Sequence, residues 1–151
     1  MSLYAIGDLH LSFTANKPMD VFGPKWENYV EKIRSGFSKL DENDVCVLCG
    51  DISWGMDLAE AREDFRFIEE LPGRKIILKG NHDLWWTSMA KMTAFLEENG
   101  FRTISFLHNN AYPFGDDAAI CGTRGWFYEE SQGETHDKKM IAREGLRLEA
   151  S

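Results

Sequence analysis

The chain has 151 residues, of which 43% are hydrophobic and 28% are charged, a balance typical of one folded domain rather than of a disordered segment. The net charge of −8 disfavours nucleic acid as a partner, because modules that bind duplexes present a basic face. No apolar run approaches the roughly 18 residues of a membrane span, and the N-terminus shows no secretory signal. The three cysteines form no even disulfide framework, so we expect a cytoplasmic protein.

Apolar runs and helical spacings alternate along the chain. We expect strands at 2–7, 45–49, 75–79, 102–107 and 118–122, and helices at 26–40, 57–71, 88–99 and 136–150. The first strand is almost continuously apolar, which is typical of a strand that is covered on both faces. Strands and helices that alternate at these lengths predict an α/β fold with a mainly parallel sheet and right-handed crossovers.

Three of these strands run into a glycine and then into carboxylate, amide or imidazole groups. The three stretches are Gly7-Asp8-Leu9-His10, Gly50-Asp51 and Gly80-Asn81-His82-Asp83. Each residue type is also common in ordinary turns, so one such stretch alone proves little. Because one strand–helix–strand unit fits between each pair, all three stretches should reach the carboxyl edge of one sheet. This ligand set suits Mn, Fe, Zn or a similar ion, and two such ions could clamp a phosphoryl group.

In order and approximate spacing, these stretches resemble the first three motifs of the calcineurin-like metallophosphoesterases. The resemblance implies a four-layer fold of the α+β sandwich type, in which two mixed sheets pack face to face with helices outside. It also implies a metal-dependent phosphoester hydrolase for a small phosphorylated substrate. In such an enzyme a dinuclear metal centre holds the hydroxide that attacks phosphorus.

The resemblance also assigns roles to the metal ligands. Asp8 and His10 would bind the first of two Mn, Fe or Zn ions. Asp51 would bridge the two ions, and Asn81 would bind the second.

Other residues would act on the substrate or support the ligands. By the same resemblance, His82 would contact the phosphate and protonate or stabilise the leaving oxygen, and Asp83 would brace the turn. Trp54 is a candidate for a pocket wall or for ordinary packing. Arg124 is a candidate for a phosphate-binding guanidinium or for a surface ion pair.

The chain departs from the family pattern at two places. After Gly50-Asp51 it lacks the Asp-Arg pair of the phosphoprotein phosphatases, which indicates a small bacterial-type phosphohydrolase. After His82 only His108 and His136 remain, and neither lies in one of the family's later histidine motifs. Gly133-Glu134-Thr135-His136 has only the outline of such a motif, and we expect it in a loop. The hypothesis is therefore one domain over 1–151 whose C-terminal part is missing, before the second sheet is complete.

Two other functions stay open. The absent histidines allow a non-catalytic metal-binding or interaction module of the same fold, with one weakly bound ion and an exposed sheet edge that favours a homodimer. A nuclease would use the same metals, but the charge of −8 disfavours a groove for a polyanion. We expect Cys46, Cys49 and Cys121 in the core, and Trp85-Trp86 packing a helix onto the sheet.

Overall fold

The computed structural model describes residues 1–125 and 134–151. The chain forms two compact units, Met1–Phe106 and Leu107–Ser151. The first contains a parallel sheet with three α-helices, and the second contains an antiparallel strand pair with one α-helix. The chain thus has the α/β composition that the sequence predicted. That both units form one domain stays a prediction.

The first unit is built on a four-stranded sheet with the strand order β1-β2-β3-β4. Its strands are β1 (Leu3–Ile6), β2 (Val45–Leu48), β3 (Arg74–Ile77) and β4 (Ile104–Phe106). All neighbouring strands are parallel, and Leu48 aligns with both Ile6 and Ile77. The carboxyl ends of β1, β2 and β3 therefore lie level at the same edge of the sheet, as the sequence predicted.

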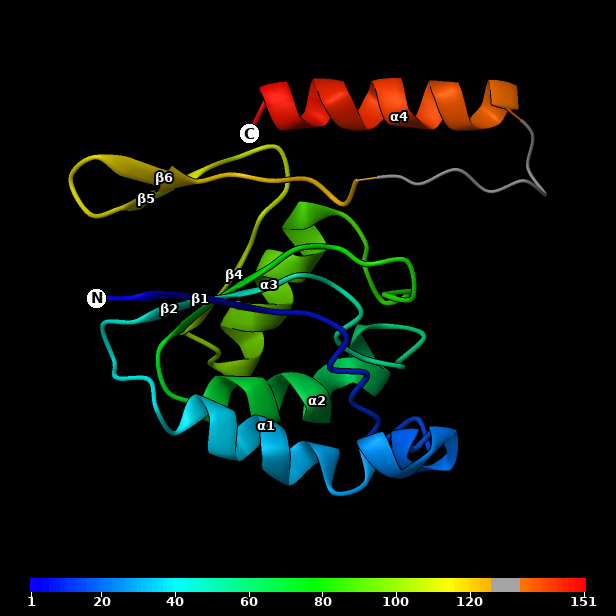
Figure 1. Cartoon of the computed structure of the whole chain (residues 1–151), viewed down its shortest axis with the longest axis vertical. Helices are drawn as coiled ribbons and strands as arrows, with labels where there is room; N and C mark the ends of the chain where they lie inside the picture. The colour runs from blue at the N-terminus through cyan, green and yellow to red at the C-terminus, as the bar shows by residue number, and fades with distance from the viewer. Residues whose placement is uncertain (126–133) are drawn as a thin grey trace. The chain divides into compact units, whose positions relative to one another are not determined.

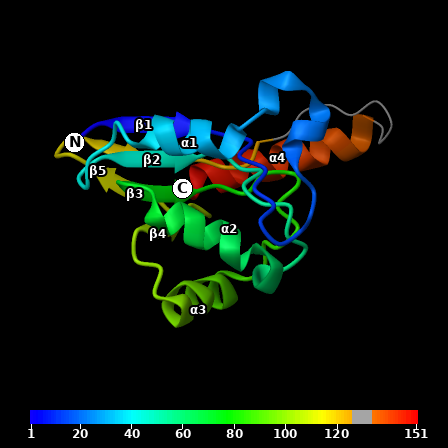
Figure 2. The same cartoon turned by 90° about the horizontal axis from the view of Figure 1, so that it is seen from below.

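Three α-helices follow the first three strands, and their bounds are α1 (Tyr29–Phe37), α2 (Leu58–Glu70) and α3 (Met89–Asn99). Figures 1 and 2 show α1 and α2 on one face of the sheet, as right-handed crossovers between consecutive strands require. The helix expected at 26–40 starts only at Tyr29, because Asn28 has a left-handed backbone with φ 53°. Two short 3₁₀ helices, η1 (Met19–Phe22) and η2 (Pro24–Trp26), precede it.

The ends of α2 and α3 follow from their caps. The carboxylate of Asp57 accepts the N–H of Glu60 at 2.9 Å, so α2 begins at the next residue, Leu58. Ser88 caps α3 in the same way, and Gly100 ends it with a left-handed backbone at φ 71°. Both helices match the predicted ranges closely because their capping residues are visible in the sequence.

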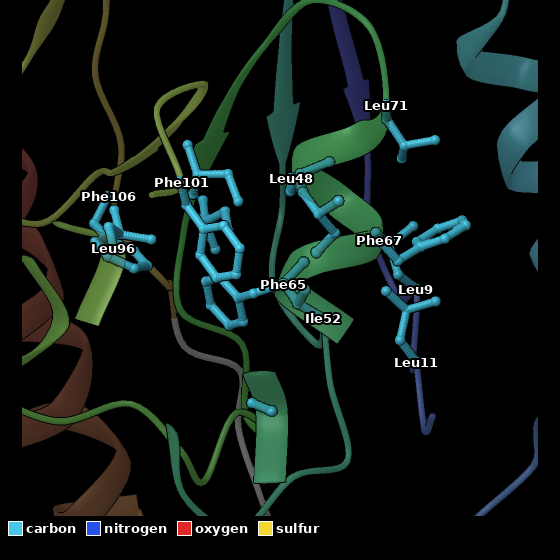
Figure 3. Packing of buried hydrophobic residues seen from close by; sticks show 14 of the residues in the cluster. Leu9, Leu11, Leu48, Ile52, Phe65, Phe67, Leu71, Leu96, Phe101 and Phe106 are labelled. Carbon is cyan, nitrogen blue, oxygen red and sulfur yellow. The ribbon is translucent and has the colours of Figure 1, made fainter. Parts of the chain in front are cut away.

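The core of the first unit lies between α2 and the sheet. Figure 3 shows Phe65 of α2 pointing toward Phe101, whereas Phe67 points toward Leu9 and Leu11. The Phe65 ring meets the Trp85 ring edge-on at 4.9 Å, and Trp85 is 1% exposed. The prediction that Trp85-Trp86 packs is confirmed, since Trp86 also lies against this core. Burial of each large ring stabilises the fold by about 2 kcal/mol.

Two expectations about burial are wrong. β1 is not covered on both faces, because Leu3, Tyr4 and Ile6 are 48%, 39% and 36% exposed. β1 is an edge strand of the sheet, and the apolar composition of a strand does not show whether it lies at an edge. Of the three cysteines only Cys46 is buried, while Cys49 and Cys121 are exposed.

The second unit contains a short hairpin and a helix. Its strands are β5 (Tyr112–Phe114) and β6 (Ala118–Ile120), which pair antiparallel, and its helix is α4 (Glu134–Glu149). β6 and α4 confirm predictions, whereas β5 was not expected. The stretch Gly133-Glu134-Thr135-His136 was expected in a loop. Residues 134 and 135 lie in α4 instead, residue 136 lies in the helix that was expected from there on, and 133 is outside the described residues.

In the part of the chain that the structure describes, no helix is long and apolar enough to cross a membrane.

Candidate metal centre

Three side chains that suit a metal ion converge at the carboxyl edge of the parallel sheet. Asp8, His10 and Asp51 each offer a ligand atom, and these atoms all lie within 4.8 Å of one another. His10 Nε2 is 3.5 Å from Asp8 Oδ1 and 3.9 Å from Asp51 Oδ2. Within residues 1–125 and 134–151, no other three His, Cys, Asp or Glu side chains come together in this way.

Backbone hydrogen bonds hold the two ligand-bearing loops side by side after β1 and β2 end. The Asp8 N–H donates to Gly50 O at 3.1 Å, and the His10 N–H donates to Asp51 O at 2.9 Å. The pairing continues to Leu11, whose N–H donates to Ile52 O at 2.9 Å. The register of the two loops is therefore fixed beyond the strands, and it brings the three ligand side chains to one place.

All three of these residues have a left-handed backbone. Their φ angles are 57° at Asp8, 43° at His10 and 54° at Asp51. For a residue other than glycine this conformation costs about 1 kcal/mol, although Asp and His tolerate it better than most. Strain of this kind is often found at functional sites, where the surrounding structure fixes the geometry.

Two glycines allow the loops after β2 and β3 to touch through their backbones. A Cβ atom on Gly50 would lie 2.5 Å from the Cα of Gly80, and Gly50 has φ 96°. A Cβ atom on Gly80 would overlap the carboxylate of Asp51. The glycines that precede Asp51 and Asn81 are thus needed for the close approach that positions these side chains.

Asp83 is buried and supports both loops. Its Oδ2 accepts the N–H groups of Asp51 and Gly80 at 2.8 and 2.7 Å. Its Oδ1 accepts the N–H of Ile52 at 2.8 Å and the indole N–H of Trp85 at 3.0 Å. Burial raises the pKa of Asp83, and the backbone donors that it accepts oppose this rise. The carboxylate therefore fixes the backbone beneath the candidate ligands.

The turn after β3 brings Asn81 and His82 to the same edge. The His82 N–H donates to Asp51 Oδ1 at 2.8 Å, and the His82 ring lies 5.8 Å from the ring of His10. Asn81 is the exposed residue between Gly80 and His82. The histidine is also exposed, so its ring is accessible to a molecule bound at this edge.

Two tryptophans surround the imidazole of His10. The Trp54 ring stacks on it with centroids 4.8 Å apart and planes 19° apart, and Trp26 meets it edge-on at 6.1 Å. The indole N–H of Trp54 points to the sulfur of Met19 at 3.3 Å, and Lys17 Nζ lies 5.3 Å from the Trp54 ring centroid. Trp54 therefore lies at the centre, in contact with a candidate ligand.

Asp64 is a further supporting residue that was not predicted from the sequence. It lies on α2, fully buried, where Oδ1 accepts the N–H of Phe13 at 2.9 Å and Oδ2 accepts the hydroxyl of Ser53. Burial raises its pKa, and these two hydrogen bonds oppose the rise. The signal in the sequence is its spacing, because it lies three residues after Ala61 and four before Ile68 on the apolar face. A carboxylate at such a position needs buried partners.

Two residues considered from the sequence belong to the second unit. Arg124 is exposed. His136 lies in α4, where its Nδ1 is 3.5 Å from Asp137 Oδ1. That Arg124 binds phosphate stays a prediction, and His136 was not expected to be a ligand.

The residues at the centre fit a divalent cation. Two carboxylates face one imidazole nitrogen, and among the described residues no lysine or arginine forms an ion pair with Asp8 or Asp51. A bound cation would compensate both negative charges, and carboxylate oxygen with imidazole nitrogen is a donor set suited to Mn, Fe or Zn. The identity and number of the ions stay predictions.

Comparison with known families agrees with this geometry. A family model described as calcineurin-like phosphoesterase matches residues 1–144. The chain belongs to this family. Calcineurin-like phosphoesterases are metal-dependent phosphoester hydrolases, and the Asp8, His10 and Asp51 group is the candidate metal site of this member.

A solved structure supports the fold of this calcineurin-like phosphoesterase. It is the crystal structure of the protein of unknown function AQ665 from Aquifex aeolicus, which is 20% identical in sequence. The match covers 95% of this chain and 72% of that chain, with a TM-score of 0.54. At this identity the likeness concerns the fold alone. None of the curated proteins matches in sequence.

Proposed function

We propose that this protein hydrolyses small phosphoesters with the help of two metal ions at the carboxyl edge of its parallel sheet. Asp8 and His10 would hold the first ion, and Asp51 would offer its carboxylate to both. Asn81 offers its amide oxygen to the second ion. The observation that carries the proposal is the convergence of the Asp8, His10 and Asp51 ligand atoms within 4.8 Å. Bound divalent ions supply positive charge to the phosphoryl oxygens and acidify bound water.

The chain's own groups orient the ester and move the proton. His82 is exposed beside His10, so its imidazole can reach a phosphate oxygen and give a proton to the leaving oxygen. Its backbone N–H holds Asp51 Oδ1, which leaves Oδ2 directed toward His10 Nε2. Asp83 keeps both loops in place without touching the ester.

A second candidate is a non-catalytic metal-binding module of the same fold. The small number of ligand residues favours this candidate, since the described residues contain one set of three His, Cys, Asp or Glu ligands. Three such ligands can hold one ion, whereas the dinuclear proposal also depends on Asn81. The two candidates therefore differ in the number of ions that they require.

Metal content and turnover distinguish the two candidates. The protein is purified without chelator, its metal content is counted by mass spectrometry, and hydrolysis of nitrophenyl phosphate and of its bis-ester is followed. Two ions per chain with turnover of either ester support the proposal. One ion or none, with neither ester hydrolysed, favours the non-catalytic module.

The substitution Asp51→Asn tests the site itself. The amide keeps the shape of the side chain and can still accept the His82 N–H, but it removes the negative charge that would hold the ions. We expect hydrolysis to fall about 100-fold, which corresponds to roughly 3 kcal/mol of transition-state stabilisation, and metal content to fall as well.

Asp57→Asn is the matched control, because this exposed carboxylate is the cap of α2 and asparagine caps equally well. It changes the net charge by the same amount and should leave both measurements unchanged. Equal activity in Asp51→Asn and the natural protein would exclude the proposed centre.

A further inference from the structure

A hollow of about 380 Å³ lies directly beside the candidate metal centre. It is formed by the end of β1, the residues that follow it, η2 and the first half of α1. Its aliphatic and aromatic walls are Ile6, Leu9, Trp26, Tyr29 and Ile33. Two lysines, Lys25 and Lys32, complete the lining together with Gly7 and Asp8.

The hollow and the metal centre share residues. Asp8 lines the hollow and also offers a ligand atom to the centre. Trp26 lines the hollow and meets the ring of His10 edge-on, while the Tyr29 hydroxyl donates to His10 O at 3.3 Å. A phosphoester whose phosphate lay at the centre could therefore extend its alcohol part into this hollow.

The walls of the hollow suit a planar ring. Trp26 and Tyr29 are half-buried, and their rings meet at 77° with centroids 5.8 Å apart, which forms an aromatic corner. Ile33 and Leu9 add buried aliphatic surface. Aromatic ligands gain both apolar burial and favourable ring contacts in such a corner.

The two lysines add a positive charge to an otherwise acidic protein. In the described part of the chain, neither Lys25 nor Lys32 forms an ion pair with a carboxylate, and Lys32 Nζ donates to the backbone oxygen of Lys25 at 3.2 Å. These two ammonium groups outnumber the one carboxylate, that of Asp8, which also lines the hollow, so in a chain with a net charge of −8 they complement an anionic group on the ligand.

We propose that this hollow binds the alcohol part of the substrate, an aromatic or heteroaromatic ring that carries a second negative charge. The ring lies against Trp26 and Tyr29, and its anionic group lies near Lys25 and Lys32. This inference rests on the proposed function, since the phosphate of the same molecule must lie at the metal centre.

Binding is tested first without any need for turnover. Phenylphosphonate and methylphosphonate, which are not hydrolysed, are titrated while the indole N–H signals are followed by NMR. The Trp26 signal is assigned by its absence in Trp26→Phe. We expect phenylphosphonate to shift the Trp26 signal saturably, with at least fivefold higher affinity than methylphosphonate. The buried Trp85 serves as the internal reference. An unmoved Trp26 signal, or equal affinity for both probes, overturns the proposal.

Kinetics then test the specificity. The ratio of kcat/KM for phenyl phosphate to that for glycerol phosphate should fall about tenfold in Trp26→Ala, the size expected for loss of one aromatic stacking partner. A preference for carboxyphenyl phosphates over phenyl phosphate should disappear in the double variant Lys25→Gln, Lys32→Gln.

Lys91→Gln is the matched control, because Lys91 lines a different hollow beside α3. It should leave both ratios unchanged.

If Trp26→Ala lowers the rates with all esters equally, Trp26 acts through His10 and the proposed subsite is wrong. If the natural protein hydrolyses none of the esters, the proposed function fails, and the NMR titration alone decides whether the hollow binds aromatic anions.

Discussion

At the scale of single residues, the contact between Gly50, Gly80 and Asp51 decides the shape of the candidate centre. The backbones of the two glycines touch, and the carboxylate of Asp51 occupies the space where a side chain at residue 80 would begin. Interiors are packed too tightly for an added methyl group to be accommodated without movement of the backbone.

We expect Gly80→Ala to lower the free energy of unfolding by at least ~2 kcal/mol and to reduce metal affinity, because Asp51 must move away from the new methyl group. Chemical denaturation and calorimetric metal titration measure the two effects.

Gly36→Ala is the control. This glycine lies in α1 with open space around it, so alanine should stabilise the protein by about 0.5–1 kcal/mol and leave metal affinity unchanged. A neutral Gly80→Ala would show that the two loops approach less closely than the structure describes.

The candidate ligands could be found from the sequence, whereas their supporting residues could not. Asp8, Asp51 and Asn81 each follow an apolar strand and a glycine, and a parallel sheet brings such positions to one edge. The stack of Trp54 on His10 and the hydrogen bonds of Asp64 depend instead on how α2 and the loops pack. Partners of that kind lie far apart along the chain, so no local spacing indicates them.

At the scale of elements, a buried lysine completes the end of α2. Lys75 lies on β3 with none of its surface exposed, and its Nζ donates to the backbone oxygens of Leu71 and Gly73 after the helix. Carbonyl groups at a helix end lack partners within the helix, and a cation there also interacts favourably with the helix dipole. Burial lowers the pKa of Lys75 to about 8.

This pKa predicts how stability changes with pH. An unfolded lysine keeps its proton up to its ordinary pKa of 10.5, whereas native Lys75 loses its proton at about pH 8. Between these values the unfolded chain binds more protons, so the free energy of unfolding should rise with pH by up to about 1.4 kcal/mol per unit. Denaturant titrations from pH 7 to pH 10 measure the slope.

Lys75→Met should remove this rise, and it should also destabilise the protein at pH 7 because the carbonyl groups lose their donor. Burial raises the pKa of Cys46 to about 11, so above pH 9 this thiol makes the free energy of unfolding fall with pH. Because Cys46 is present in both proteins, the difference between their slopes reports Lys75. Identical slopes in the two proteins would contradict the proposed effect of Lys75.

The sequence predicts where most helices and strands lie, but not which of their faces are buried. Capping residues made the bounds of α2 and α3 predictable. β5 was not expected, because it is only three residues long and lies between the turn-forming stretches Asn109-Asn110 and Gly115-Asp116-Asp117. Its Pro113 fits a two-stranded sheet, in which each strand has a free edge. The exposure of β1 depends on the order of strands in the sheet, which a single apolar run does not contain.

At the scale of the whole molecule, the candidate ligands all come from one of the two compact units. Asp8, His10, Asp51 and Asn81 lie in Met1–Phe106. A metal ion that binds only the native state should therefore stabilise this unit. The fold of the second unit contributes no residue of the candidate ligand set.

We expect added Mn²⁺ or Zn²⁺ to raise Tm, and a free ion concentration 100 times Kd to add about 2.7 kcal/mol of stability. Hydrogen exchange should slow in residues 7–11, 50–54 and 80–83 and stay unchanged in 112–120. EDTA should reverse both effects. Slower exchange in 112–120 of the same size, or no change in Tm, would show that the ions do not bind at the proposed centre.

The hydrogen bonds from Asp51 to the turn after β3 have a consequence for the order of events in folding. His82 and Asp83 are 31 and 32 residues away from Asp51 along the chain, so each contact closes a long loop and depends on the sheet that lies between them. A peptide that copies any one of the three turns would lack the others and could not reproduce the centre. We therefore expect metal ions to bind a site that the tertiary structure has already assembled, so that they stabilise the folded chain without starting its folding.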